Sequence, residues 1–407
     1  MPRTMTVEQA YKMVSALYQQ ATGTASIAVV DTATFTAVAN ATWSLGYNRI
    51  VNALKEVLSG LIISEKPYEG QFREIWADAP TYGAHVLKIS YLDNANAVTN
   101  PAWSLADGQT LGVHTVKLPK AYEANIYGQN TINAFVTLPR KQLRTAFESA
   151  EKMAQFFSGL MTNIRNQLNQ QKEALCRSTL INYIGGKVAY AAAHTAEASN
   201  HVVHLLTEYN DKFGHNYSDI ASVRNNPASY EQFVKYIFAR MNDIVAQMAI
   251  RDNRYHVNPT ADARNPGVIM RHSPVDALRC YVLREWLTEI DTQVMTGVWN
   301  REYLKMLAHE SVEYWQSPEE RGSVIVTASY MDNDGTVKTA NGDGSGLSIL
   351  NIFGVIFDRD ALGVGVTDEF TGDTPMDVEK EAFNRYWKLD TRNYNDFTEK
   401  GVILCMD

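Results

Sequence analysis

Three histidines in the middle of the chain have the spacing that comes nearest to a metal site. His201 and His204 are three residues apart, so on a helix they would share a face, and His194 precedes them. A zinc site needs a third and usually a fourth ligand, and no cysteine or acidic pair stands at a suitable spacing. We therefore expect solvated polar histidines, and we predict no bound metal and no cofactor.

Two loops resemble ion-binding or phosphate-binding motifs. Counted from Asp332, a calcium loop needs glycine at position six and glutamate at position twelve, but Gly335 is fourth and Asp343 is twelfth. We expect a hairpin tip there. The glycines of 341–346 would have to open a helix and carry a lysine to hold phosphate, yet the apolar run Leu347–Phe357 predicts a strand instead.

Catalytic side chains are not grouped in any familiar pattern. The sequence contains no Gly-x-Ser-x-Gly elbow and no His-Glu-x-x-His motif, so we predict no catalytic residues and no enzyme. The alternative is a cytoplasmic metal-dependent enzyme with its site in residues 188–346. Its support is the histidine group and the strand-to-helix step expected at Arg271–Pro274. The aromatic residues of 383–397 could stack on bases, but the flanking charges are mixed, so we expect packing.

Composition places the chain among soluble globular proteins of two or three domains. It has 407 residues, 45% apolar and 20% charged, and a formal net charge of -8. That charge argues against broad electrostatic capture of nucleic acid. We see no signal peptide and no apolar run long enough to span a membrane. Cys176, Cys280 and Cys405 are isolated, which fits synthesis in a reducing cytoplasm.

One long helix is the element that we expect to position everything else. From Thr137 to Ile184 apolar residues recur at the alternating three-and-four spacing of one helix face, and Gly185 and Gly186 follow. We expect the two glycines to end this helix. Its apolar face should pack on strands at Leu347–Phe357 and Phe383–Leu389.

An extended region precedes the helix, between Gly70 and Pro139. Leu87, Ile89 and Tyr91 alternate with Lys88 and Ser90, which predicts a strand with its apolar side buried. Further strands are predicted at Val113–Leu118 and at 132–138. We expect a long two-stranded ribbon, which would be stable mainly against something else, such as a neighbouring subunit.

The remaining elements are shorter. We expect a small-residue linker at Thr32–Thr42, irregular chain at Tyr190–Ser229, a helix from Ser229 to about Arg251 and a helix from Ser273 to about Trp286. Strands are predicted at Val324–Tyr330, Phe383–Leu389 and Gly401–Cys405.

Three segments near the end carry a resemblance to a known family. They are Ile356–Val364, then Asn384–Trp387, and then Arg392–Leu404, which contains Asn-Asp-Phe-Thr-Glu-Lys-Gly before an apolar strand. Together with the order of arm, ribbon, long helix and mixed domain, they resemble the major capsid proteins of tailed bacteriophages. The resemblance implies an α+β chain with the Hong Kong 97-type fold.

In that family the parts have assigned places. Residues 1–67 would be the N-terminal arm with small helices, and 68–136 the extended ribbon called the E-loop. Residues 137–187 and 347–407 would form the peripheral domain with its spine helix, and 188–346 the axial α/β domain. The short N-terminus implies a separate scaffolding protein rather than a cleaved one.

The resemblance implies a virion protein that assembles itself. Copies would form hexamers and pentamers of an icosahedral shell enclosing double-stranded DNA, without sequence-specific binding and without a membrane. A scaffolding protein and the portal would be partners, and assembly would take place in the bacterial host cytoplasm. Another structural protein, such as a tail or surface-layer component, is a third hypothesis.

Six charged residues are our candidates for assembly contacts, each weighed against an ordinary solvated charge. Three lie on the ribbon and three at the helix start: Lys88, Lys117, Lys120, Arg140, Arg144 and Glu148. Some relatives cross-link a ribbon lysine to an asparagine near the chain end. Lys117, Lys120, Asn393 and Asn395 are present, but no pattern marks them, so we do not assign that chemistry.

Overall fold

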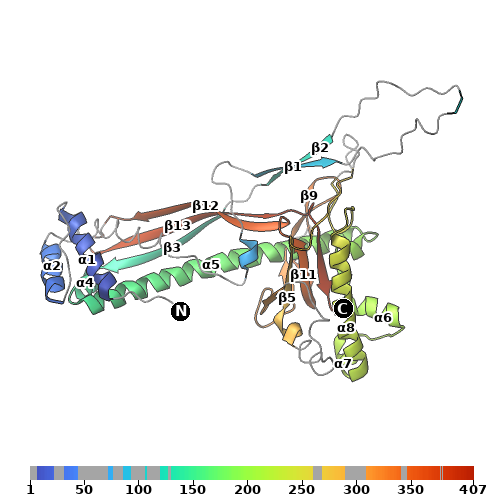
Figure 1. Ribbon diagram of the computed structural model, residues 1–407, viewed down its shortest axis with the longest axis horizontal. Coiled ribbons are helices and arrows are strands. Elements are labelled where there is room, and N and C mark those ends of the chain that lie inside the picture. The colour runs from blue at the N-terminus through green and yellow to red at the C-terminus, as the bar shows by residue number, and fades with distance from the viewer. Residues whose placement is uncertain are drawn as a thin grey trace. The chain divides into compact units, whose positions relative to one another are not determined.

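The computed structural model of the chain mixes helices and sheets (Figure 1). It describes residues 7–22, 32–44, 72–76, 86–92, 106–107, 120–126, 130–259, 268–288, 309–340, 346–375, 377 and 379–407. The chain forms two compact units. Unit 1 comprises Met1–Gly70, Gln129–Ala174 and Val366–Arg392, and unit 2 comprises Gln71–Gly128, Leu175–Gly365 and Asn393–Asp407.

Unit 1 is built on a three-stranded sheet with the order β12-β13-β3. Strand β3 (Asn130–Pro139) pairs antiparallel with β13 (Ala382–Asn395), and β12 (Leu362–Asp373) lies on the other side of β13. Inward-facing residues alternate along β3, as its sequence predicted. However, β3 was expected in the ribbon, and it pairs instead with the returning chain.

Helices in the described part of unit 1 complete its core. Helices α1 (Val7–Thr22), α2 (Thr32–Ser44) and α4 (Arg140–Ala146) bury apolar residues together with the start of α5. The linker predicted at Thr32–Thr42 is therefore wrong. Phe35, Val38 and Ala39 recur at helical spacing and are buried, so packing overrides the poor helix propensity of the many threonines.

The long helix exists, but both of its predicted ends are wrong. Residues 137–139 finish β3, α4 is a separate short helix, and α5 runs from Ala150 to Ala193 over 44 residues. It passes straight through Gly185 and Gly186. As predicted, its apolar face packs on the returning strands, with Phe383 in the core of unit 1 and Val355 and Phe357 in that of unit 2.

Close packing explains the two glycines inside the helix. A Cβ atom on Gly185 would lie 2.4 Å from Cγ1 of Val326, and one on Gly186 would lie 2.3 Å from Cζ of Phe397. Both distances are far shorter than real carbon contacts, so the helix can approach Val326 and Phe397 only without side chains at these positions.

Unit 2 is built on a five-stranded sheet with the order β4-β14-β11-β5-β6. Its strands are β4 (Val202–His204), β14 (Gly401–Cys405), β11 (Ile352–Asp358), β5 (Leu278–Leu283) and β6 (Glu310–Val312). The central strands pair antiparallel, whereas β4 and β6 run parallel to their neighbours. The three cysteines of the chain are all buried and reduced.

Helices α6 (Leu205–Phe213), α7 (Ile220–Arg224) and α8 (Pro227–Met248) share a core with this sheet. The irregular chain predicted at Tyr190–Ser229 is therefore wrong. Helix α8 begins after Asn226, whose side chain accepts from the Ser229 amide, rather than at Ser229 itself.

The helix predicted from Ser273 is also wrong, because its middle is strand β5. Five of the six residues of β5 are buried, as expected for a strand covered on both faces, and such a run carries no alternation to distinguish it from a buried helix. The strand predicted at Val324–Tyr330 is two short strands, β7 (Val324–Val326) and β8 (Ser329–Met331).

Short pairs make up the rest. Strand β7 pairs with β10 (Leu347–Ile349), and β8 pairs with β9 (Val337–Thr339). Gly335, at φ +78°, lies in the turn between β8 and β9, which confirms the predicted hairpin tip at Asp332–Gly335. Strand β1 (Val86–Leu92) pairs antiparallel with β2 (Lys120–Ile126) as part of the expected ribbon. The prediction at Val113–Leu118 lies outside the described residues.

Candidate functional site

The base of the β1–β2 ribbon is fixed to unit 2 by a network of charged side chains. Lys88 Nζ donates to the carboxylate of Asp396 and to Oε1 of Glu399, the latter at 2.6 Å. Arg271 Nη2 donates to Ser90 Oγ at 2.7 Å and lies 3.4 Å from Glu399 Oε1. Lys88 and Ser90 alternate along β1, so both face the same side and hold the strand at two points.

The acidic side of this network lies in the loop between β13 and β14. Asp396 is 4% exposed, and its Oδ1 accepts from the backbone amide of Thr398 at 2.8 Å and from the Thr398 hydroxyl at 2.6 Å. These bonds fix one carboxylate oxygen within the loop, and the other oxygen accepts from Lys88. The loop therefore presents a preformed acceptor to the ribbon.

Burial and charge act in opposite directions on this network. Burial raises the pKa of Glu399 even though Lys88 and Arg271 lower it, so its carboxylate is only partly compensated. Burial also opposes the charge on Lys88, but the two carboxylates outweigh it and raise the pKa of Lys88. The ammonium is thus charged at neutral pH.

Strand β1 buries its polar side and exposes Ile89, which is the reverse of what its sequence predicted. Ser90 is 4% exposed, whereas Ile89 is 54% exposed. We expected the side of the strand with Leu87, Ile89 and Tyr91 to be buried, and Lys88 to contact another subunit or the solvent. The polar side faces the rest of unit 2 because Lys88 bonds to Asp396 and Glu399 there. These partners lie some 300 residues further along the chain. No local pattern in the sequence could have revealed them.

His201 is buried rather than solvated, which corrects the expectation for this residue, whereas His204 is exposed as expected. It is 1% exposed, and its Nδ1 lies 3.4 Å from Nζ of Lys187, which is itself fully buried and donates to the Tyr255 carbonyl at 3.0 Å. Burial lowers the pKa of His201 well below its usual value and that of Lys187 to about 7. His256, buried nearby, has its pKa lowered to about 4, mainly by burial.

The other two histidines each lie within hydrogen-bond distance of a carboxylate. His194 Nε2 lies 2.6 Å from Oδ1 of Asp332, whose Oδ2 accepts from Lys338, and His204 Nδ1 lies 2.9 Å from Oδ1 of Asp407. Within the described ranges, no three side chains of His, Cys, Asp or Glu are grouped as metal ligands. His194 and His204 each contact a carboxylate more than a hundred residues further along the chain, within unit 2.

The remaining candidate residues are spread over both units. Arg140 and Arg144 are exposed on α4 in unit 1, and exposed Glu148 accepts from Lys152 Nζ at 2.6 Å. Lys120 opens β2, and Lys117 lies outside the described residues. Sequence reasoning missed Arg271, Asp396 and Glu399, although the last two lie in the tail segment that carried the resemblance.

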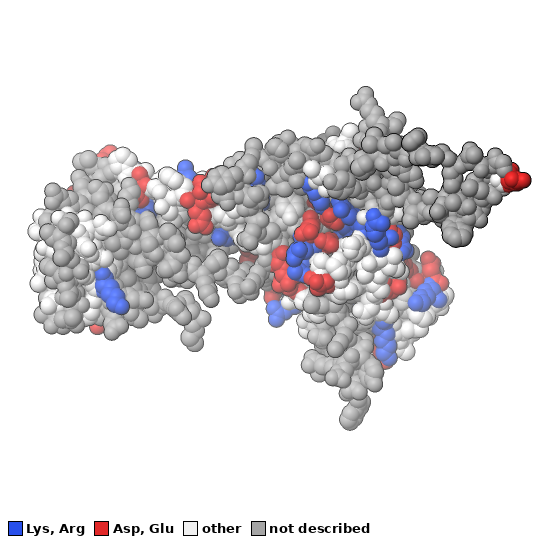
Figure 2. Space-filling model, turned by 45° about the horizontal axis from the view of Figure 1, so that its top comes forward, with Lys and Arg blue, Asp and Glu red and all other residues white. Residues whose placement is uncertain are grey.

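The charges on the surface are mixed. Figure 2 shows Lys and Arg interspersed with Asp and Glu over the described part of the face in view. Such a face gives no broad cationic track for nucleic acid. Among the described helices, none is both long and apolar enough to cross a membrane.

Comparison with known proteins gives one family. The model of the Phi29-like phage major capsid proteins matches residues 10–394. No curated protein sequence matches the chain.

Among solved structures, the chain is similar to one from the capsid of Staphylococcus phage Andhra, with 12% identity, coverage of 84% of this chain and 86% of that one, and a TM-score of 0.48. A structure of the head fibre and inner core protein of bacteriophage P68 has 10% identity, coverage of 84% and 86%, and a TM-score of 0.49. One from the capsid of cyanophage P-SCSP1u has 12% identity, coverage of 84% and 89%, and a TM-score of 0.39.

Proposed function

Because this chain belongs to the Phi29-like phage major capsid protein family, we propose that its copies assemble into the icosahedral shell that encloses the packaged double-stranded DNA of a tailed phage. Members of this family are shell-forming structural proteins of the virion. The match over residues 10–394 is the observation that carries the proposal. The alternative of a metal-dependent enzyme in residues 188–346 has no support from the family.

The β1–β2 ribbon is the part that we assign to contact between subunits, as the E-loop. Its polar side is held by Asp396, Glu399 and Arg271, so Ile89 faces away from its own unit. An extended arm supplies interface area without a larger core, and shell subunits need such area.

Further partners follow from the proposed role. The subunits would form hexamers and pentamers, assembled in the bacterial host cytoplasm with a scaffolding protein and the portal. DNA would be enclosed without sequence-specific contacts. The net charge of -8 supports this, because a strongly basic lining would bind the polymer and oppose its movement.

Electron microscopy of the purified protein tests the proposal. We expect closed particles or capsomers after expression alone or with the phage's scaffolding protein. A strictly monomeric product under both conditions would contradict it. Deleting residues 94–111 should impair assembly and leave the thermal unfolding of the subunit largely unchanged, whereas normal shells from this deletion would refute the role of the ribbon.

A further inference from the structure

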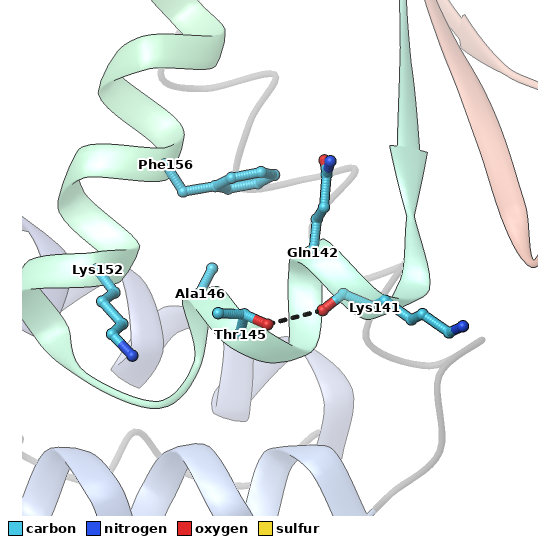
Figure 3. A pocket seen from close by; sticks show the side chains of 6 residues that line it. All are labelled: Lys141, Gln142, Thr145, Ala146, Lys152 and Phe156. Carbon is cyan, nitrogen blue, oxygen red and sulfur yellow. Dashed lines mark hydrogen bonds between the residues drawn. The ribbon is translucent and has the colours of Figure 1, made fainter.

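A groove lies in unit 1 at the corner where α4 ends and α5 begins. Its volume is about 520 Å³, and it is lined by Lys141, Gln142, Thr145, Ala146, Lys152 and Phe156. Figure 3 shows Phe156 of α5 and Gln142 of α4 reaching over the same side of the hollow, while Lys141 and Lys152 extend from its opposite ends. The groove thus combines an apolar middle with a cation at either end.

The middle of the groove is held in place by the core behind it. Ala146 is buried, and half-buried Phe156 packs against the core cluster of unit 1. The Thr145 hydroxyl donates to the Lys141 carbonyl at 3.1 Å, which fixes its orientation on α4. A volume of several hundred Å³ with an apolar wall and a few polar groups is typical of a site that receives a side chain or small ligand.

The rim of the groove is basic, although the whole chain is acidic. Residues 140–152 contain four cations and two carboxylates, a local charge of +2, whereas the chain carries -8. Lys152 is paired with Glu148, and Lys141 is exposed and forms no ion pair with any described residue. A bound carboxylate would therefore meet Lys141 directly and compete with Glu148 for Lys152.

We propose that this groove binds an acidic amphipathic segment of a second protein. One apolar side chain of that segment would insert beside Phe156, and its carboxylates would face Lys141 and Lys152. The shape and charge favour a peptide over nucleic acid, because a local charge of +2 neutralises too few phosphates for stable binding at physiological salt. The inference deepens the proposed function, since a separate assembly protein could supply such a segment.

Peptide binding to the isolated subunit tests the groove. The probe is a fluorescein-labelled helix of three Glu-Leu-Glu-Glu-Leu-Leu-Glu heptads, followed by fluorescence anisotropy. We expect Lys141→Glu to weaken its binding about tenfold, because attraction becomes repulsion, and Thr145→Trp to weaken it at least as much by filling the groove. Lys388→Glu, at an exposed lysine of the same unit, is the matched control and should leave the Kd unchanged.

Several outcomes would overturn the proposal. One is equal binding of the peptide by the native protein and both groove variants. Another is equal binding of a peptide in which every Glu is replaced by Lys. A third is that duplex DNA displaces the peptide from the native protein and binds both groove variants more weakly. Gln142→Trp replaces Thr145→Trp if the latter does not fold by circular dichroism. Because binding is measured on subunits and assembly by microscopy, a protein that forms shells but does not bind the peptide refutes the groove alone.

Discussion

At the scale of single residues, the buried basic side chains of unit 2 determine how stability responds to pH. Burial lowers the pKa of His256 to about 4 and that of His201 well below its usual value, so the folded state favours the neutral rings. In the unfolded chain these rings titrate near pH 6.5. The folded state therefore loses stability as the pH falls from about 6.5 towards 4.

We predict that the free energy of unfolding falls by on the order of 2 kcal/mol over this range through His256. Urea denaturation of the subunit at several pH values measures it. His256→Gln keeps an amide donor for the Ile269 carbonyl and removes the titration, so its loss over the same range should be smaller. Identical pH profiles for the two proteins would contradict the prediction.

Lys187 affects how the free energy of unfolding depends on pH in the alkaline range. Its pKa is lowered to about 7 by burial, against an ordinary value of 10.5. The neutral amine suits the folded state, so this residue alone should increase stability as the pH rises from about 7 to 10.

The anchor of the ribbon is a second determinant at residue scale. Lys88→Met should lower the free energy of unfolding of unit 2 by on the order of 2 kcal/mol, because it leaves the buried Asp396 carboxylate without its cation and Glu399 with Arg271 alone. Lys152→Met removes an exposed pair and is the control, which should unfold like the native protein. Equal effects of the two substitutions in urea denaturation would refute this role for Lys88.

At the scale of elements, the interior of α5 is set by two glycines. Gly186→Ala should lower the free energy of unfolding by about 1–3 kcal/mol, because its Cβ would overlap Phe397. In the same helix nothing lies within 4 Å of a Cβ added at Gly159, so Gly159→Ala should raise stability by about 0.5–1 kcal/mol. Thermal unfolding of both variants checks the prediction, and a stabilising Gly186→Ala would disprove the close-packing account.

The same glycines show how far the sequence predicts elements. The periodicity of α5 was readable, and so were the strands at Phe383–Leu389 and Gly401–Cys405. Glycine, however, marks a helix end and a close contact alike, and only the position of Phe397 distinguishes them. Strand β5 failed for a related reason, because residues buried on both faces show no period.

The candidate site was predictable only in part. The tail segment containing Asp396 and Glu399 was recognised, and Lys88 was chosen, but their contact joins parts of the chain that sequence spacing cannot relate. The prediction that His201 is solvated was wrong for the same reason, because Lys187 and Tyr190 contact its ring only in the folded unit.

At the scale of the whole molecule, the exposed side of the ribbon should decide assembly. Ile89→Asp should leave the subunit folded, because the side chain is more than half exposed, and should abolish particles in electron micrographs by placing a charge in the contact. Ile325→Asp is matched in exposure at 55% and should still form particles. Normal shells from Ile89→Asp would exclude this face as an interface.

The order of strands in the five-stranded sheet also sets a schedule for the nascent chain. Strand β14 lies between β4 and β11, although it is made last of the five. Until residue 405 has emerged from the ribosome, β4 and β11 lack their shared neighbour, and their edges can pair with other chains. Subunits growing side by side on one messenger RNA therefore pass through an aggregation-prone interval that ends only when the final strand enters the middle of the sheet.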